Sequence, residues 1–186
     1  MKALTISGLI IAVIIGGLSA CTVKSAVDLN YQPADINLPP CDRSISLVEL
    51  VDERGEKAVG KTNEGKLFYG NISVTEWVSR ALYKELEKSG CRVEYHEKEY
   101  SFDTDYTLTG KIQDVFVTQV SLTEYNASMR LKLAVKTGEE QIFNRQFSST
   151  YSKKTVPSPG VNSKVLTVVL QGMMKEVVPE IRKNLK

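Results

Sequence analysis

Histidine is nearly missing from this 186-residue chain, which contains only His96. One histidine excludes a histidine-based metal cluster and argues against nucleophilic catalysis that depends on a histidine base. The chain also lacks an excess of one charge: it has 24 Lys and Arg residues and 22 Asp and Glu residues, and both kinds are dispersed along the sequence. No basic stretch indicates a nucleic-acid partner. With 42% hydrophobic and 25% charged residues, the composition predicts an ordinary folded protein without a common enzyme design.

The first twenty-one residues have the pattern of an export signal. Met1 and Lys2 form a short positive region, and an uncharged, mostly aliphatic run follows to Leu18. This run is shorter than the ~20 apolar residues of a membrane-spanning helix and ends in small residues, as cleavable signals do. Residues 1–20 are therefore predicted to be a signal peptide.

The residues that close this signal, Leu18-Ser19-Ala20-Cys21, resemble the lipobox of bacterial lipoproteins. The resemblance implies that Cys21 carries a diacylglyceryl group and becomes the acylated N-terminus after cleavage. Thr22, and not Asp, follows, which by similarity to proteobacterial sorting favours the outer membrane over the inner one, with the domain facing the periplasm. The alternative is an ordinary secretory signal with a chance cysteine.

Residues 21–40 are predicted to be a flexible, lipid-anchored tether. The segment has no sustained hydrophobic period, few bulky apolar residues and three prolines, Pro33, Pro39 and Pro40. Fully extended, it reaches at most ~65 Å from the membrane. The folded domain is accordingly expected over residues 41–186.

Hydrophobic periodicity over residues 41–186 predicts an α+β fold. The expected elements are a buried strand over 45–51, a helix from the capping box at Ser73 to Gly90, strands over 93–96, 105–119, 127–136 and 143–151, and a helix from Asn162 or Ser163. We expect a bulge near Asp114, an edge position for the last strand and a helix kink or restart before Pro179. The arrangement is a two-layer sandwich, β-α-β-β-β-β-α, with a mixed sheet of about five strands and two helices on one face.

Two phrases support a family resemblance: Asp52-Glu53-Arg54 running on to Val59-Gly60, and Asp105-Tyr106-Thr107-Leu108-Thr109-Gly110-Lys111-Ile112. They resemble strand phrases of the YajG-like small bacterial lipoproteins. The layout is also similar to that of the lipopolysaccharide-assembly lipoprotein and of lipoproteins that activate peptidoglycan synthases. These groups are adaptors and accessory factors, so the resemblance implies an envelope protein partner and transfers no catalytic residue.

The remaining chemical motifs are weak. The stretch from Gly60 to Leu67 nearly matches a phosphate-binding loop, but Leu67 replaces the hydroxyl that holds magnesium, so no nucleotide is expected. His96 is expected to be a solvated surface side chain. The candidate carboxylates are Asp52, Glu53, Asp103, Asp105, Asp114 and Glu124. They lie in or beside turns, where Asp and Glu commonly serve as caps. The alternative is that two of them form a catalytic pair for hydrolysis, although no spacing singles out such a pair.

A disulfide between Cys41 and Cys91 is predicted. Once Cys21 is consumed by lipid, these two cysteines remain, and an oxidising compartment preserves such a pair. If a right-handed crossover makes the strands that follow them parallel neighbours, both sulfurs lie at the same end of the sheet. The alternative is two buried, unpaired thiols.

The sequence thus predicts a lipid-anchored, non-enzymatic accessory or adaptor of the cell envelope, with no cofactor, metal or catalytic residue. The alternative is an accessory that handles lipid or lipopolysaccharide. In that case Trp77, Met129, Phe143, Phe147 and the methionines of the terminal helix, Met173 and Met174, would line a lipid groove between helix and sheet, and not simply pack the core.

Overall fold

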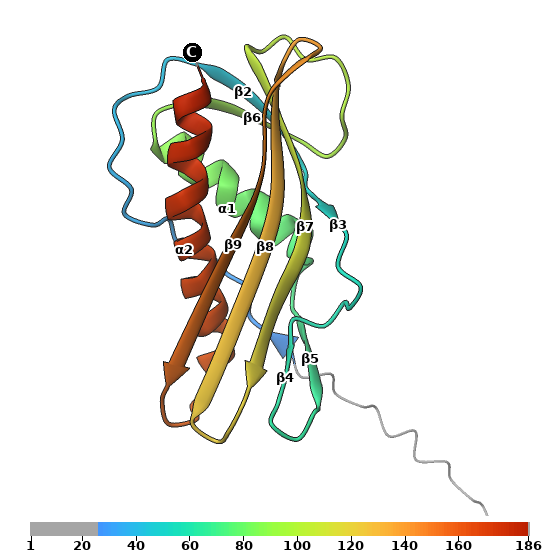
Figure 1. Ribbon diagram of the computed structural model, residues 1–186, viewed down its shortest axis with the longest axis vertical. Coiled ribbons are helices and arrows are strands. Elements are labelled where there is room, and N and C mark those ends of the chain that lie inside the picture. Colours follow the sequence, from blue (N-terminus) through green and yellow to red (C-terminus); the bar gives the residue numbers. More distant parts are fainter. Residues whose placement is uncertain (1–25, 186) are drawn as a thin grey trace, which may run out of the picture.

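The computed structural model describes residues 26–185. Three long strands run the length of the molecule, and helix α2 lies beside them (Figure 1). The elements in chain order are β1 (Ala26–Val27), β2 (Ser44–Val48), β3 (Val51–Asp52), β4 (Gly60–Lys61), β5 (Leu67–Gly70), α1 (Val74–Lys88), β6 (Arg92–His96), β7 (Tyr106–Gln119), β8 (Glu124–Thr137), β9 (Glu140–Lys154) and α2 (Val161–Asn184). The α+β class predicted from periodicity is confirmed.

The sheet is mixed, as expected, but it is larger than the predicted five strands. The predicted strands correspond to β2, β6, β7, β8 and β9, and four short strands join them. Strand β7 organises the sheet, because β2, β3 and β4 pair with it in parallel along one edge while β8 pairs antiparallel along the other. Strands β1, β3 and β4 have two residues each. Such pieces carry no readable hydrophobic period, so the sequence could not reveal them.

Strand β2 is the buried central strand that its aliphatic run predicted. Its parallel neighbours are β6 on one side and β7 on the other, and Ile45 and Leu47 have no exposed surface. The predicted parallel pairing of the strands at 45–51 and 93–96 is confirmed by β2 and β6, although β3, β4 and β5 lie between β2 and α1 in the chain. The expected register shift near Asp114 is present between Ile112 and Asp114 of β7. Strand β9 pairs with β8 alone among the described strands, which confirms its edge position.

Helix α1 begins and ends where the sequence indicated. The Ser73 hydroxyl accepts a hydrogen bond from the Glu76 amide at 3.0 Å, which satisfies one free donor of the first turn. The Glu76 carboxylate lies 3.0 Å from the Arg80 guanidinium. At the other end Gly90 has φ +88°, the left-handed conformation that glycine adopts without strain.

Helix α2 corrects two expectations. It begins at Val161 with Gly160 as the N-cap, and not at Asn162 or Ser163, because the Ser163 hydroxyl donates to the carbonyl of Asp28 instead. It also continues past Pro179 to Asn184 without a restart. Val177, Val178 and Ile181 are fully buried on either side of the proline, so tertiary packing holds the helix together despite the missing amide.

The domain begins earlier than residue 41. Residues 26–40, predicted to be flexible tether, contain β1 and four buried side chains, Val27, Leu29, Tyr31 and Ala34. The prolines suggested a linker, but the alternation of Val27, Leu29 and Tyr31 with polar residues lets this segment bury one side. The tether prediction is therefore wrong from Ala26 onward.

Candidate functional site

Residues 26–40, called the docked segment below, connect the predicted lipid site to the domain. At its start, Ala26 and Val27 pair in parallel with Tyr69 and Gly70 of β5. The amide of Leu29 then donates to the side-chain oxygen of Asn71 at 2.7 Å. Leu29 fills the space beside Gly70, where an added Cβ would lie 2.4 Å from a Leu29 methyl carbon. The segment thus contributes to both the sheet and the core.

A buried carboxylate on α1 holds the middle of the docked segment. Glu85 is 2% exposed, and it accepts hydrogen bonds from the Tyr31 hydroxyl and the Ala34 amide. Burial raises the pKa of Tyr31 well above its usual value, and the hydrogen bond to Glu85 and its charge raise it further. Tyr31 therefore stays a neutral donor to Glu85 at physiological pH.

Both helices bind the docked segment through its carbonyl groups. From α1, the Trp77 indole donates to the carbonyl of Asn30 at 2.9 Å. From α2, the Gln171 side chain donates to Gln32 at 3.0 Å, and Arg182 donates to Pro39 at 2.7 Å. These bonds satisfy backbone acceptors that have no partner strand. The segment is therefore fixed to two helices and one strand.

A disulfide between Cys41 and Cys91 closes the end of the docked segment. The two Cα atoms lie 4.6 Å apart, and the bond encloses a sequence separation of 50 residues. The cysteines stand just before β2 and β6, whose parallel pairing aligns Ser44 with Arg92. This is the geometry that the predicted crossover required, so the disulfide is confirmed and the alternative of two unpaired thiols is wrong.

Cys21 itself lies outside the described residues. The docked segment begins five residues after it, at Ala26. Within residues 26–185, neither helix combines the length and apolar character needed to cross a bilayer.

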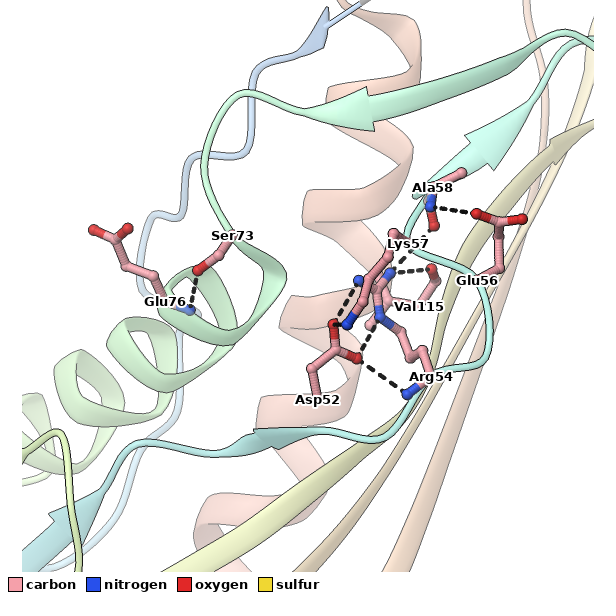
Figure 2. A network of polar contacts seen from close by, with 8 residues as sticks. All are labelled: Asp52, Arg54, Glu56, Lys57, Ala58, Ser73, Glu76 and Val115. Carbon is pink, nitrogen blue, oxygen red and sulfur yellow. Dashed lines mark hydrogen bonds and ion pairs between the residues drawn. The ribbon is translucent and has the colours of Figure 1, made fainter.

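A second polar cluster lies beside the N-terminus of α1 (Figure 2). Arg54 binds Asp52 in a two-pronged ion pair, with Nε 2.9 Å from Oδ1 and Nη2 3.0 Å from Oδ2. Its Nη1 donates to the carbonyls of Ala58 and Val115 at 3.2 and 3.3 Å. Burial raises the pKa of Asp52, but the hydrogen bonds and charge of Arg54 outweigh it and hold that pKa below its usual value.

This cluster borders a cavity of about 300 Å³ that also reaches Ser73 and Thr75. Arg54 is 9% exposed, and its donors are directed at groups of the protein itself. The arrangement ties the loop after β3 to strand β7. It therefore has a structural role. The sequence placed Asp52 among the candidate carboxylates and Arg54 in the same family phrase, but it did not indicate that the two side chains pair.

The structure disperses the other carboxylates that the sequence singled out. Asp105 accepts from the amide and hydroxyl of Ser44 at 2.8 and 2.7 Å, and Asp114 accepts from the Ser128 hydroxyl at 2.5 Å. Glu53 pairs with Lys111 at 2.5 Å. Over residues 26–185 no three His, Cys, Asp or Glu side chains form a group that could hold a metal ion.

His96 is not the solvated side chain that the alternation predicted. Its side chain is 15% exposed, because the ring of Phe102 stacks on it with centroids 4.4 Å apart. The hydroxyl of Tyr100 lies 2.8 Å from Nδ1, and the hydroxyl of Ser46 lies 3.3 Å from Nε2. Phe102 and Tyr100 lie in the loop after β6. The alternation of residues along the strand therefore could not predict that they bury His96.

The side chains considered for a lipid groove are packed in the core. Trp77, Met129, Phe143 and Phe147 are between 1% and 9% exposed. The stretch from Gly60 to Leu67 includes β4 and its turn into β5, and the next helix starts only at Val74.

Comparison with known proteins adds similarity of fold. No family model and no curated protein matches the sequence. The crystal structure of XCC0632 from Xanthomonas campestris, assigned to the family model DUF330, superposes with a TM-score of 0.65 at 12% identity, covering 86% of this chain and 95% of that one. CT253 from Chlamydia trachomatis gives a TM-score of 0.56 at 10% identity, covering 78% of this chain and 98% of that one. A minor lipoprotein from Acinetobacter baumannii gives a TM-score of 0.46 at 17% identity, covering 76% of this chain and 94% of that one. The YajG-like resemblance stays a prediction, and the chain shares a fold with the first two proteins.

Proposed function

We propose that this protein is a lipid-anchored lipoprotein of the bacterial envelope that acts as a non-enzymatic accessory or adaptor. In this proposal Cys21 carries the lipid, and the domain faces the periplasm from the outer membrane. The lipobox supports the anchor. Asp105 and Asp114 accept hydrogen bonds from serines and Glu53 pairs with Lys111, and this dispersal supports a binding role over catalysis.

The observation that carries the proposal is the docked segment. Only four residues, 22–25, separate Cys21 from Ala26, and the five extended steps from one to the other span at most ~18 Å. A domain anchored through Cys21 would therefore stay close to the bilayer, in place of the ~65 Å reach that a free tether would allow. Such a short attachment suits a protein that presents one fixed surface to a partner at the membrane.

The lipid-handling alternative receives no support from the core. An acyl chain between α2 and the sheet would have to displace Met173 and Met174, which have no exposed surface. Native cores are packed too closely to admit a chain without separating helix from sheet.

Fatty-acid labelling tests the anchor. Replacing Cys21 with Ala should abolish incorporation of labelled palmitate and block maturation of the signal peptide. The double variant Cys41→Ala/Cys91→Ala is the matched control and should keep the label, since these cysteines form the disulfide. Palmitate on the Cys21→Ala protein would contradict the proposal.

Site-specific crosslinking tests the adaptor role. The open face of the sheet has a shallow cavity of about 290 Å³ lined in part by Thr109, Lys132 and Asn144. A photoreactive residue at Asn144 should give one defined protein adduct in intact cells. The same residue at Lys84 on α1 serves as the control. Equal adducts from both positions, or a substrate turned over by the purified protein, would argue against a specific adaptor.

A further inference from the structure

One end of the sheet gathers three connections around the start of the docked segment. We call it the proximal end, and it consists of Ala26, the 62–66 turn between β4 and β5, the 120–123 turn between β7 and β8, and the 155–160 loop before α2 (Figure 1, lower end). Ala26, Thr62 and Ser158 line one cavity of about 370 Å³. The Thr155 amide donates to the Thr123 carbonyl at 2.8 Å, which places the last two connections side by side.

Large apolar side chains are exposed on these connections. Val120, Leu122 and Val156 are 51%, 68% and 76% exposed. Among residues 26–185, Leu122 and Val156 are the most exposed of the large hydrophobic side chains. All three lie in turns, where polar residues are usual. The hydrogen bond between Thr155 and Thr123 joins the 120–123 turn to the 155–160 loop. We call Leu122 and Val156, which lie beside these two residues, the apolar tip.

Positive charge surrounds this tip. Lysines at the proximal end or beside it, each at least partly exposed, are Lys61, Lys66, Lys153, Lys154 and Lys164. The carboxylates in the same region are Asp28, Glu64 and Glu124. The opposite end, formed by the 97–105 loop and the turn between β8 and β9, carries mixed charge. Its carboxylates are Glu97, Glu99, Asp103, Asp105, Glu139 and Glu140, but Lys98 lies in the same loop, Lys136 pairs with Glu99, and Arg43 and Arg92 lie near Asp105.

We propose that the proximal end rests on an anionic lipid surface, with Val120, Leu122 and Val156 in the headgroup region and the surrounding lysines against lipid phosphates. The proposal deepens the proposed function and rests on it, because the anchor enters at this same end. Exposed apolar residues ringed by lysine suit the membrane interface, where apolar contact and charge attraction act together. The opposite end would then point away from the bilayer.

Depth-dependent fluorescence quenching tests this orientation on the full chain. The lipidated protein, purified from membranes and reconstituted into vesicles, would carry an environment-sensitive nitrobenzoxadiazole label at Leu122→Cys. The matched control is Glu139→Cys, which lies in the turn at the opposite end. Cys41 and Cys91 stay unlabelled because they form the disulfide. Circular dichroism would verify that each labelled variant is folded.

We expect lipids with a nitroxide on the acyl chain to quench the Leu122→Cys label several-fold more strongly than the Glu139→Cys label. Vesicles that contain phosphatidylglycerol should enhance this quenching relative to phosphatidylcholine alone. The variant Lys153→Glu/Lys154→Glu should reduce it. A matched distal change, Lys98→Glu, should not.

Three outcomes would overturn the proposal. If the protein floats with the vesicles but both labels are quenched equally, the orientation is wrong while the anchor stands. If the Leu122→Cys label is shielded from aqueous iodide without being quenched by lipid nitroxide, the proximal end contacts protein and not lipid. If the protein does not float at all, the anchor and the orientation both fail.

Discussion

Single buried polar residues decide how the N-terminal region is held. Glu85 lies on the apolar stripe of α1 with Ala81 and Leu82, so a carboxylate faces the core and must find donors there. It finds them on the docked segment, in Tyr31 and Ala34. The stripe is readable from the sequence, and a charged residue in it is the signal that could have indicated a buried partner.

Glu85→Ala should lower the free energy of unfolding by about 3 kcal/mol, because two buried donors lose their acceptor. Hydrogen exchange at the amides of Leu29 and Ala34 should accelerate at the same time. Glu85→Gln, which keeps an acceptor oxygen, should cost less, and Lys84→Ala on the exposed face should change little. Chemical denaturation and exchange mass spectrometry measure both effects. Unchanged exchange in Glu85→Ala would show that the segment is held without this carboxylate.

Asp52 should give the protein an acid-sensitive contribution to stability. Its folded pKa lies below the unfolded value of about 3.9, so the contribution is complete above about pH 5 and is lost as the pH falls through the folded pKa. Asp52→Ala should cost about 3 kcal/mol at pH 7, because Arg54 then remains buried without its partner. The difference between wild type and variant should shrink below about pH 4. Denaturation from pH 3 to pH 7 checks this, and a difference independent of pH would contradict it.

Among the secondary-structure elements, β7 and β8 depend on a close approach at Gly110. A Cβ at this position would lie 2.7 Å from the Lys132 carbonyl oxygen and 2.5 Å from a Leu133 methyl carbon. The carbonyl belongs to the neighbouring strand, so it cannot move away without disturbing the hydrogen bonds between the strands. The glycine is required by space here, and the strand pattern alone gave no sign of it.

Gly110→Ala should therefore destabilise the protein by about 1–3 kcal/mol through overpacking. Gly55→Ala is the matched control, because an added Cβ there meets nothing within 4 Å. It should be neutral or slightly stabilising, since alanine reduces the freedom of the unfolded chain. Thermal and chemical denaturation of both variants give the comparison. Equal stability of the two would mean that β8 shifts freely at this point.

Residues 26–185 form a single unit that includes the docked segment. Buried Val27, Leu29 and Tyr31 contribute to the same core as Trp77 and Phe68. In the proposed orientation, the short connection to Cys21 and the lysines at the proximal end would face the membrane.

A fragment of residues 26–185 should be more stable than a fragment of residues 41–185 by at least about 3 kcal/mol, because removing the segment exposes apolar surface and leaves Glu85 without donors. Both fragments keep the disulfide, so its contribution does not enter the difference. Equilibrium denaturation under non-reducing conditions measures it. Equal stability would restore the flexible tether that the prolines suggested.

The sequence by itself determined the elements whose signals are local. The capping serine at Ser73, the stop at Gly90 and the alternation of β8 are written in neighbouring residues, and all three match the structure. The pairing of Cys41 with Cys91 also followed, because a right-handed crossover leaves little choice for strands on either side of a helix. The lipobox predicted at Cys21 rests on a local pattern of the same kind and stays a prediction.

Only the tertiary structure decided that residues 26–40 are buried against the domain, that the ring of Phe102 stacks on His96, and that Arg54 binds the carbonyl of Val115. The docked segment and Arg54 depend on groups far away in the chain: Glu85 lies 54 residues after Tyr31, and Val115 lies 61 after Arg54. His96 is covered by Tyr100 and Phe102 of the nearby loop, whose path over the strand only the tertiary structure shows. Pro179 shows the same effect, since buried neighbours keep helix α2 continuous where local preference favours an interruption. Burial and hydrogen bonds between distant residues set these outcomes, and such interactions leave no periodic mark in the sequence.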